Sequence, residues 1–188
     1  EEIGFPIPWD PKHFIDVIRD RIKREEKVWT GAYMIGTQGN KTDKPIFISH
    51  YVLSPLWLQR DNLRPRVGDT LKEFADRIIN VKNQGRFMVG QIVADIKYDE
   101  LGPLFKATDW DTYAVRGPGS HRGLNRLISR KPESPWTDKE WYKHLMELRE
   151  KIPTLHAQDL QSCLCEYDKM ERVLWGEGKP RAKYDGRG

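Results

Sequence analysis

The sequence predicts a mainly α-helical protein. Apolar residues recur at the three-to-four-residue spacing of a helix in several separate segments, whereas the two-residue alternation of a half-buried strand is scarce. With 188 residues, of which 38% are hydrophobic, the chain has enough apolar material for a single core. We therefore expect one helical domain over residues 1–188, with an extended N-terminal arm at 1–11 and a basic C-terminal tail at 176–188.

The first helix is expected from Pro11 to about Lys27. Proline is tolerated in a first helical turn, and Asp10 is placed to cap the free N–H groups of that turn. One side of the segment is apolar and the other charged, which is the pattern of a surface helix; the apolar side consists of Phe14, Ile15, Ile18 and Ile22.

The segment Ile46 to Leu58 is strongly apolar and admits two interpretations. Its β-branched and aromatic residues favour a strand, but Pro55 lacks the N–H that a central strand needs. Its length allows a buried helix that is kinked at Ser54, and we expect the helix. The polar segment Gln59 to Asp69 is expected to be a basic loop.

Three further helices are marked by capping residues or by a proline at their end. Thr70 is placed to cap a helix from Leu71 to about Val81, with Glu73 in its first turn. Ser129 to Pro135 is a proline-bounded linker. Thr137 and Glu140 form a capping box for a helix that Pro153 ends, and an amphipathic pattern predicts a last helix from Leu155 to Leu174.

The stretch from Lys82 to Ile128 holds two glycine-centred turns, and each is followed by a helical apolar pattern. The first turn is Asn83-Gln84-Gly85 and the second is Gly117-Pro118-Gly119-Ser120. A glycine turn at a helix start directs free N–H groups and the positive end of the helix dipole to one place, which suits a phosphate. Arginines crowd the second turn and two aspartates precede it, so this stretch is expected to be a reaction site rather than a surface loop.

The overall composition narrows the classes of function. The net charge of +4 is compatible with a polyanionic partner such as nucleic acid. The two cysteines, Cys163 and Cys165, are too close together for an ordinary disulfide, so we expect a reducing, intracellular environment and a cytoplasmic location. The cysteines and five scattered histidines have no zinc-finger spacing, no apolar run is long enough to span a membrane, and no G-x-x-x-x-G-K-[ST] loop is present. We expect no metal site and no cofactor, although Mg²⁺ is compatible with the chemistry considered below.

The central stretch resembles the helix-hairpin-helix DNA glycosylases. In that superfamily a glycine hairpin opens a helix, a segment of the type V-D-T-H-V follows, and the next helix ends in N-R-L. The corresponding segments here are 83–87 at the hairpin, 110–115 (WDTYAV) at the aspartate, and 124–127 (LNRL) at the end. The resemblance implies a glycosylase-like helical fold and places Asp111 at the catalytic aspartate, but the glycosylase lysine has no clear counterpart.

Two longer phrases are more similar to one branch of that superfamily, the thymine-hypermodification transferases of bacteriophages. These are also called amino acid:DNA transferases or α-glutamyl/putrescinyl thymine pyrophosphorylases. The phrases are GRFMVGQIVADIKY and AVRGPGSHRGLNRL, and the ending CEYDKMERVLWGEGKPRAKY is similar as well. The chain departs from the branch around residues 36–60. The resemblance implies an enzyme of an infected bacterial host that acts on double-stranded DNA carrying 5-(pyrophosphoryloxymethyl)uracil, where an amino acid or polyamine displaces pyrophosphate.

Site roles follow from that reaction. Pyrophosphate leaves easily when cations and N–H donors neutralise its charge, and an incoming ammonium must give a proton to a carboxylate before it attacks. The expected catalytic residues are Asp111, Asp109 and His121. The expected pyrophosphate-binding residues are Arg116, Gly117, Gly119, Ser120, Arg122 and Arg126.

Further residues are expected to contact the DNA. The candidates for contact with the base or the amine are Gln91, Asp95, Asn125 and Trp29, and those for the phosphate backbone are Arg60, Arg64, Arg66, Lys82 and Arg86. Two other functions stay open at this point. One is an ordinary DNA glycosylase, for which the missing lysine argues against the lyase type. The other is a DNA-binding module without catalysis.

Overall fold

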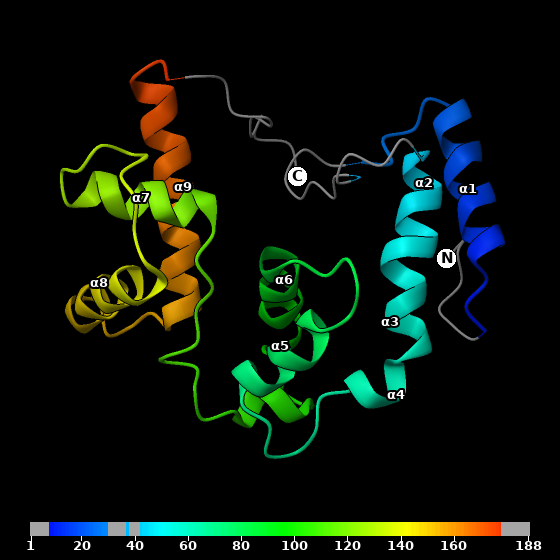
Figure 1. Cartoon of the computed structure of the whole chain (residues 1–188), viewed down its shortest axis with the longest axis horizontal. Helices are drawn as coiled ribbons and strands as arrows, with labels where there is room; N and C mark the ends of the chain where they lie inside the picture. The colour runs from blue at the N-terminus through cyan, green and yellow to red at the C-terminus, as the bar shows by residue number, and fades with distance from the viewer. Residues whose placement is uncertain (1–7, 30–36, 38–41, 178–188) are drawn as a thin grey trace. The chain divides into compact units, whose positions relative to one another are not determined.

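The computed structural model describes residues 8–29, 37 and 42–177, and this part of the chain contains helices and no strand (Figure 1). The mainly α fold class is therefore confirmed. The chain divides into two compact units. The first comprises the described residues up to Arg64 together with Asn80–Gln84, and the second comprises Pro65–Ile79 and the described residues from Gly85 onward. The single-domain expectation stays a prediction.

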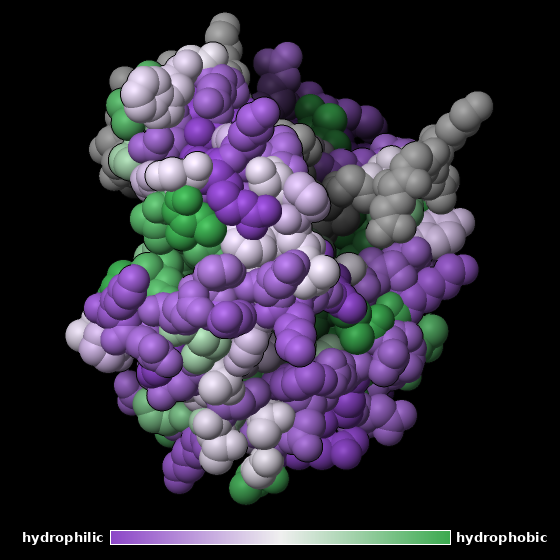
Figure 2. Space-filling model, turned by 60° about the vertical axis from the view of Figure 1, so that its left-hand side comes forward, coloured by the Kyte–Doolittle hydropathy of each residue, from purple (hydrophilic) through white to green (hydrophobic). Residues whose placement is uncertain are grey.

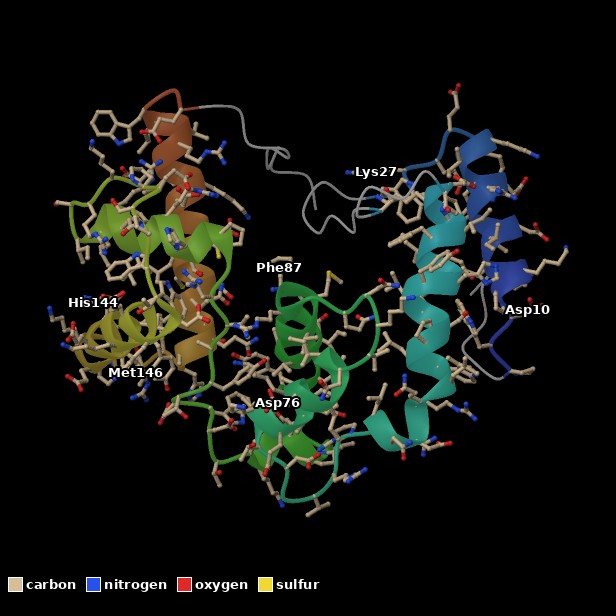
Figure 3. All side chains as sticks on the ribbon, in the orientation of Figure 1. Asp10, Lys27, Asp76, Phe87, His144 and Met146 are labelled. Atoms are coloured by element: carbon tan, nitrogen blue, oxygen red, sulfur yellow. The ribbon has the colours of Figure 1, made fainter. Side chains whose placement is uncertain are left out.

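In the first unit, helix α1 (Pro11–Lys23) begins as expected and ends earlier than expected. The carboxylate of Asp10, labelled at the start of α1 in Figure 3, accepts hydrogen bonds from the N–H groups of Lys12 and His13 at 2.8 and 3.0 Å. Ile15 and Ile18 are buried. The helix stops because the residues that follow are charged and give no further apolar anchor, and the chain turns at Glu25, whose φ is +59°.

Residues 44–58 form one helical run of three parts, α2 (Lys44–Ile46), the π-helical η1 (Phe47–Leu53) and α3 (Ser54–Leu58). The helical expectation for 46–58 is thus confirmed. Pro55 has no N–H, so the carbonyl of Tyr51, four residues earlier, loses its helical donor. The side-chain amide of Asn83 replaces that donor at 2.8 Å, and Gln84 donates to the carbonyl of Val52 at 3.2 Å.

The core of this unit lies where the helical run meets α1. Phe47, Ile48 and Val52 are buried there, and the half-buried hydrophobic residues that pack on them are Phe14, Trp29 and Leu53. Trp9, from the expected N-terminal arm, donates to the hydroxyl of Ser54 at 2.9 Å. Residues 1–7 of the arm and 178–188 of the tail lie outside the described residues.

The expectation of a loop from Gln59 to Asp69 is wrong at its start, where Arg60–Leu63 form the short helix α4. The carbonyl of Gln59 accepts the N–H groups of Asn62 and Leu63, which closes one helical turn. The turn ends at Arg64, because a residue before proline is disfavoured in helical conformation and Pro65 follows. Residues 65–70 are not helical.

The second unit holds five longer segments of helix and one short 3₁₀ turn. Thr70 and Glu73 exchange hydrogen bonds at the start of one helix, and Thr137 and Glu140 do so at the start of another, so both expected caps are confirmed. The bounds of the elements are α5 Leu71–Ile79, α6 Arg86–Ile96, η2 Pro103–Lys106, α7 Pro118–Leu127, α8 Asp138–Lys151 and α9 Ala157–Leu174.

Helices α7 and α9 cross at very short distance, and two glycines of α7 make this possible. A Cβ atom at Gly123 would lie 2.0 Å from the carbonyl oxygen of Leu164, and one at Gly119 would lie 3.2 Å from the sulfur of Cys165. Around the crossing lies a hydrophobic core cluster of the unit, which consists of Leu124, Trp136, Trp141, Leu145, Ala157, Leu160 and Leu164. The glycines therefore serve helix packing, and residues on the exposed sides of α7 and α9 are brought together.

The face of the molecule drawn in Figure 2 is largely hydrophilic, with hydrophobic residues in scattered groups. This agrees with the charged content of 32%. None of the helices in the described part of the chain combines the length and the apolar character that a membrane crossing requires.

Candidate functional site

The close crossing of α7 and α9 places two arginines of α7 on one aspartate of α9. Arg122 and Arg126 are four residues apart and so share a face of α7. Their Nε atoms donate to the two carboxylate oxygens of Asp168, at 2.8 and 3.0 Å. Asp168 is only 1% exposed. The terminal nitrogens have other neighbours, because Arg126 Nη2 binds the carboxylate of Glu177 and Arg122 Nη1 lies 3.8 Å from that of Glu133.

Both arginines line a hollow of about 390 Å³, which we call the arginine hollow; its lining residues are Arg122, Arg126, Pro132, Glu133, Arg172 and Glu177. Arg126 reaches the carboxylate of Glu177, and Arg172 Nε donates to the backbone carbonyl of Glu177 at 3.3 Å. The Glu177 carboxylate raises the pKa of Arg126 above its ordinary value, and Arg126 lowers that of Glu177.

The guanidinium of Arg122 has N–H groups that form no hydrogen bond within the described residues. Beyond its bond to Asp168, its one further charged neighbour among the described residues is Glu133, at 3.8 Å from Nη1. That separation is too long for a hydrogen bond. A partly exposed guanidinium that is fixed by a buried carboxylate is prepared to bind a phosphate through two parallel hydrogen bonds.

The second glycine turn does not offer the open cradle of N–H groups that the sequence suggested. The Gly117 N–H donates to the Ser120 hydroxyl at 3.1 Å, and the N–H and hydroxyl of Ser120 lie against the sulfur of Cys165. Ser120 is fully buried, and burial raises the pKa of the Cys165 thiol. Gly119 is occupied by packing on the same cysteine. These three expected pyrophosphate contacts instead close the start of α7 against α9.

Two other residues expected at the pyrophosphate hold the loop before α8. Arg116 donates to the carbonyl of Trp136 at 2.9 Å and pairs with Asp138 at 2.7 Å. His121 Nε2 donates to the carbonyl of Ser134 at 2.8 Å, and its other ring nitrogen lies 3.4 Å from Arg116. Both nitrogens of His121 thus have neighbours within the protein, and proton donation by His121 stays a prediction.

The two aspartates that precede the turn are also engaged elsewhere. Asp109 accepts the N–H groups of Leu71 and Lys72, at 2.7 and 3.0 Å, and so caps α5 from a distant part of the sequence. Asp111 contacts Arg149 at 2.5 Å and His156 at 2.8 Å. The hydrogen bond from His156, together with the charge of Arg149, holds the pKa of the Asp111 carboxyl below its ordinary value.

Asp111 therefore lies near the N-terminal end of α9, whereas the arginine hollow lies on its C-terminal half. Asp168 follows His156 by twelve positions, which is about 18 Å along a helix axis. A base at Asp111 and a diphosphate held by Arg122 and Arg126 would be too far apart to act on one methylene carbon. The structure separates the two parts of the expected site.

A buried charge network occupies the region around Asp111, and we call it the Lys97 network. Lys97 is fully buried, and its Nζ lies 3.0 Å from Asp159 and 4.8 Å from the ring centres of Tyr98 and Trp110. The hydroxyl of Tyr98 donates to the same aspartate at 2.7 Å. Trp110 also meets the ring of His156, with ring centres 5.0 Å apart. A lysine without exposed surface neutralises Asp159 rather than meeting a ligand.

The residues expected to contact the base or the amine are scattered. Asn125 is fully buried and holds the loop before α8, as described below. Gln91 is half-buried and Asp95 exposed on α6. Trp29 belongs to the core of the first unit, where Lys44 Nζ lies 4.4 Å from its ring centre.

The residues expected at the DNA backbone are divided between the units. Arg60, Arg64 and Lys82 lie in the first, where Arg60 rests on the ring of Trp57 at 4.5 Å. Arg66 and Arg86 lie in the second, and Arg86 opens α6, followed by the labelled Phe87 in Figure 3.

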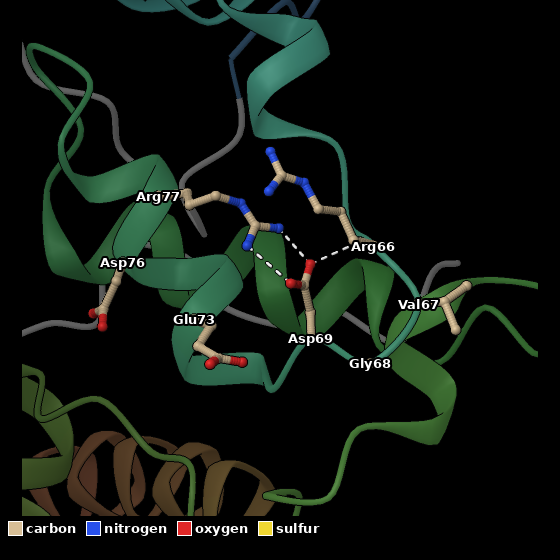
Figure 4. A pocket seen from close by; sticks show the side chains of 7 residues that line it. All are labelled: Arg66, Val67, Gly68, Asp69, Glu73, Asp76 and Arg77. Carbon is tan, nitrogen blue, oxygen red and sulfur yellow. Dashed lines mark hydrogen bonds and ion pairs between the residues drawn. The ribbon is translucent and has the colours of Figure 1, made fainter.

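A second hollow, of about 560 Å³, lies at the start of α5 and is built from both signs of charge (Figure 4). Arg77 and the backbone N–H of Arg66 both bind the carboxylate of Asp69 there, and the pKa of Asp69 is lowered by Arg77. Glu73 and Asp76 complete the lining with Val67 and Gly68. The excess of carboxylates makes this hollow a poor site for a phosphate.

Sequence reasoning missed Asp168, Arg172, Glu133 and Glu177. Asp168 and Arg172 are four residues apart on α9, as Arg122 and Arg126 are on α7, so the signal was a second charged pair of the same spacing. Within the described residues no group of three or more His, Cys, Asp or Glu side chains is placed to hold a metal ion.

Comparison with known proteins gives one family. Residues 2–179 match the family model described as "5-hmdU DNA kinase, helical domain". No curated protein and no solved structure is significantly similar to the chain.

Proposed function

Since the chain belongs to the family of the helical domain of the 5-hmdU DNA kinase, which is related to modification of 5-hydroxymethyluracil in DNA, we propose that it acts on that base after phosphorylation. The reaction we propose is the transfer of an amine, from an amino acid or a polyamine, to the 5-methylene carbon of a pyrophosphorylated base. The C–N bond forms as the C–O bond to pyrophosphate breaks, and pyrophosphate departs with the electron pair.

The observation that carries this proposal is the arginine hollow. Pyrophosphate is a good leaving group only when its growing charge is neutralised, and fixed guanidinium groups do this without reorganisation. Asp168 fixes Arg122 and Arg126, and Arg172 adds a third cation from α9. The volume of the hollow, about 390 Å³, is more than ten times the roughly 30 Å³ that one water occupies.

The side chain of Glu177 occupies part of the hollow and has to move out when the substrate binds. Its carboxylate binds Arg126 in the position that a phosphate oxygen would take. With Glu177 displaced, the three arginines of the hollow exceed the two remaining carboxylates, those of Asp168 and Glu133, so the hollow gains an excess of positive charge. A doubly or triply charged diphosphate competes well for such a site against a single carboxylate.

DNA is the binding partner in this proposal. Basic side chains contact its backbone phosphates, and these contacts do not depend on the base sequence. The exposed basic residues Arg86 and Lys82 serve here as backbone contacts, with Arg60, Arg64 and Arg66. Binding should therefore weaken steeply with salt concentration.

A second candidate function is that of a domain which binds 5-hydroxymethyluracil DNA and presents the base to a kinase domain. The family description favours it, because it names a domain of a kinase. The chain has no G-x-x-x-x-G-K-[ST] loop of its own for a nucleoside triphosphate. A presenting domain would bind the hydroxymethylated DNA without changing it.

The test uses a duplex oligonucleotide with one 5-(pyrophosphoryloxymethyl)uracil and a panel of amino acids and polyamines. Nucleoside chromatography and pyrophosphate release are the measurements. We expect a new nucleoside with one amine, at least 100-fold slower formation by Arg122→Ala, and unchanged rates in Lys151→Ala, which removes an exposed charge from α8.

Three results would contradict the proposal. Substrate left intact with every amine, while the folded protein binds the duplex, would favour the presenting domain. Release of free base with an abasic site would indicate a glycosylase. Equal rates for Arg122→Ala and wild type would show that the arginine hollow is not the pyrophosphate site.

A further inference from the structure

The loop before α8 is held at the carbonyl groups of the two residues that flank Glu133 in the sequence. The side-chain amide of Asn125 donates to the carbonyl of Pro132 at 2.9 Å and to that of Ser134 at 2.8 Å. Asn125 has no exposed surface. Carbonyl oxygens only accept hydrogen bonds, so the amide nitrogen must face them. One buried side chain thus fixes the backbone on either side of Glu133.

Other contacts hold the same loop from several directions. His121 donates to the carbonyl of Ser134 at 2.8 Å. The guanidinium of Arg130 lies 3.9 Å from the ring centre of Trp136 and donates to the carbonyl of Pro135 at 3.1 Å. Fixing a surface loop in one conformation costs entropy. Because several contacts restrain this loop, the residue at its tip is held in a defined position.

What the loop presents is the carboxylate of Glu133 at the rim of the arginine hollow. The side chain is 80% exposed, and it lines the hollow with Arg122 Nη1 at 3.8 Å. In the described part of the chain its carboxylate receives no hydrogen bond. The other acids at the hollow are committed, because both oxygens of Asp168 bind arginine Nε atoms and Glu177 binds Arg126.

We infer that Glu133 is the carboxylate that receives the incoming amine in the transfer reaction, and that Asn125 is the residue that positions it. This inference rests on the proposed function. Arg122 holds the diphosphate on one side, and Glu133, a few ångströms away on the rim, holds the ammonium group of the second substrate. Both substrates then bind at the same hollow. Asp111 could not hold the amine there, because it lies near the other end of α9.

The proposed transfer begins with loss of a proton from the amine. The ammonium R–NH₃⁺ gives one proton to Glu133 and becomes R–NH₂. Its lone pair forms a bond to the 5-methylene carbon, and the C–O bond breaks with its electron pair on pyrophosphate. The product carries R–NH₂⁺–CH₂, and the proton on Glu133 passes to solvent. A glutamine at position 133 still accepts a hydrogen bond but takes no proton and offers no charge to the ammonium.

Steady-state kinetics of Glu133→Gln, with the amine concentration varied, test the role of the carboxylate. We expect kcat/KM for the amine to fall about 100-fold, within the range for loss of a general base, with the Kd for inorganic pyrophosphate within twofold of wild type. Glu133→Asp should recover part of the rate. Glu150→Gln, which removes an exposed acid of α8, is the matched control and should behave as wild type.

A double-mutant cycle tests the positioning role of Asn125. Asn125→Ala should lower kcat/KM for the amine at least tenfold in the wild-type background, and should have no further effect once Glu133→Gln is present. The melting temperature of each variant is measured as well, to detect any loss of stability. Additive losses in the double variant would mean that Asn125 acts only on stability, and would overturn its assignment.

Two outcomes separate this inference from the function on which it rests. Transfer by wild type, with Glu133→Gln within threefold of it, overturns the role of Glu133 and leaves the proposed function in place. Absence of transfer by wild type with every amine overturns both.

Discussion

The two ends of helix α9 use an aspartate in opposite ways. Near the N-terminal end, Asp159 neutralises Lys97, whose side chain is fully buried under Tyr98 and Trp110. On the C-terminal half, Asp168 is itself buried and binds the Nε atoms of two arginines, and both arginines line a hollow. Both regions are rich in charge, but only the second keeps N–H donors that a ligand can reach. Accessible donors, rather than charge density, distinguish a binding site from a structural ion pair.

The largest effects should come from removing these two aspartates one at a time. Asp159→Asn leaves the buried Lys97 without its carboxylate, and Asp168→Asn removes the buried carboxylate that Arg122 and Arg126 share. Each change costs on the order of 3–5 kcal/mol, or about 10 °C in Tm for a chain of this length. Pyrophosphate affinity should separate them, since it should fall at least tenfold in Asp168→Asn and stay near wild type in Asp159→Asn. Calorimetric titration with pyrophosphate measures this difference, and equal affinities would remove the distinction between the two ends.

The next effect concerns the crossing that creates the arginine hollow. A methyl group at Gly123 would collide with the backbone of Leu164, whereas one at Gly85 meets nothing within 4 Å. Gly123→Ala should therefore lose about 3 kcal/mol of stability and part of its pyrophosphate affinity, because the arginines move away from Asp168. Gly85→Ala is the control and should change Tm by less than about 2 °C. A tolerated alanine at position 123 would show that the helices are not packed this closely.

A smaller effect is expected at Glu177, which competes with the ligand. Glu177→Gln keeps the shape of the side chain but removes the charge that binds Arg126. Pyrophosphate should bind about fivefold more tightly, equivalent to roughly 1 kcal/mol. Weaker binding in this variant would mean that Glu177 takes part in the site instead of blocking it.

The smallest effect belongs to Asp111, at the other end of α9, and it depends on pH. The pKa of this carboxyl is lowered in the folded protein, so its contribution to stability is complete above the ordinary value of 3.8 and is lost as the pH falls through the lowered value. The side chain is half exposed, so the contribution is at most about 1 kcal/mol. Wild type should have a higher Tm than Asp111→Asn at pH 5, where the Asp111 carboxylate is fully charged. This Tm difference should become smaller in more acidic buffer. A larger difference there would mean that the pKa of Asp111 is raised in the folded protein instead of lowered.

Much of the fold was predictable because helix starts depend on neighbouring residues. The caps at Asp10, Thr70 and Thr137 and the helical period of the segments that follow are local features. The π-helical segment was not predictable, because it depends on Pro55 and on amides from Asn83 and Gln84, which are some thirty residues away.

The candidate site was predictable only in part, for the same reason. Arg122 and Arg126 were expected to bind pyrophosphate, and the structure places them on the arginine hollow. The glycines of the second turn looked like a phosphate cradle, but tertiary packing against Cys165 and Leu164 uses them. Asp109 carries no local sign that it caps a helix that begins almost forty residues earlier. Residue type and spacing indicated the chemistry, and long-range contacts decided which residues are available for it.

The central claim is that the C-terminal half of α9, and not its N-terminal end, binds the diphosphate. Isothermal titration of inorganic pyrophosphate into wild type, Arg122→Ala and Arg149→Ala tests it most directly, because the two arginines lie in the two regions compared above. We expect one binding site in wild type, at least tenfold weaker binding in Arg122→Ala, and wild-type affinity in Arg149→Ala. Binding that is lost in Arg149→Ala and kept in Arg122→Ala would contradict the account.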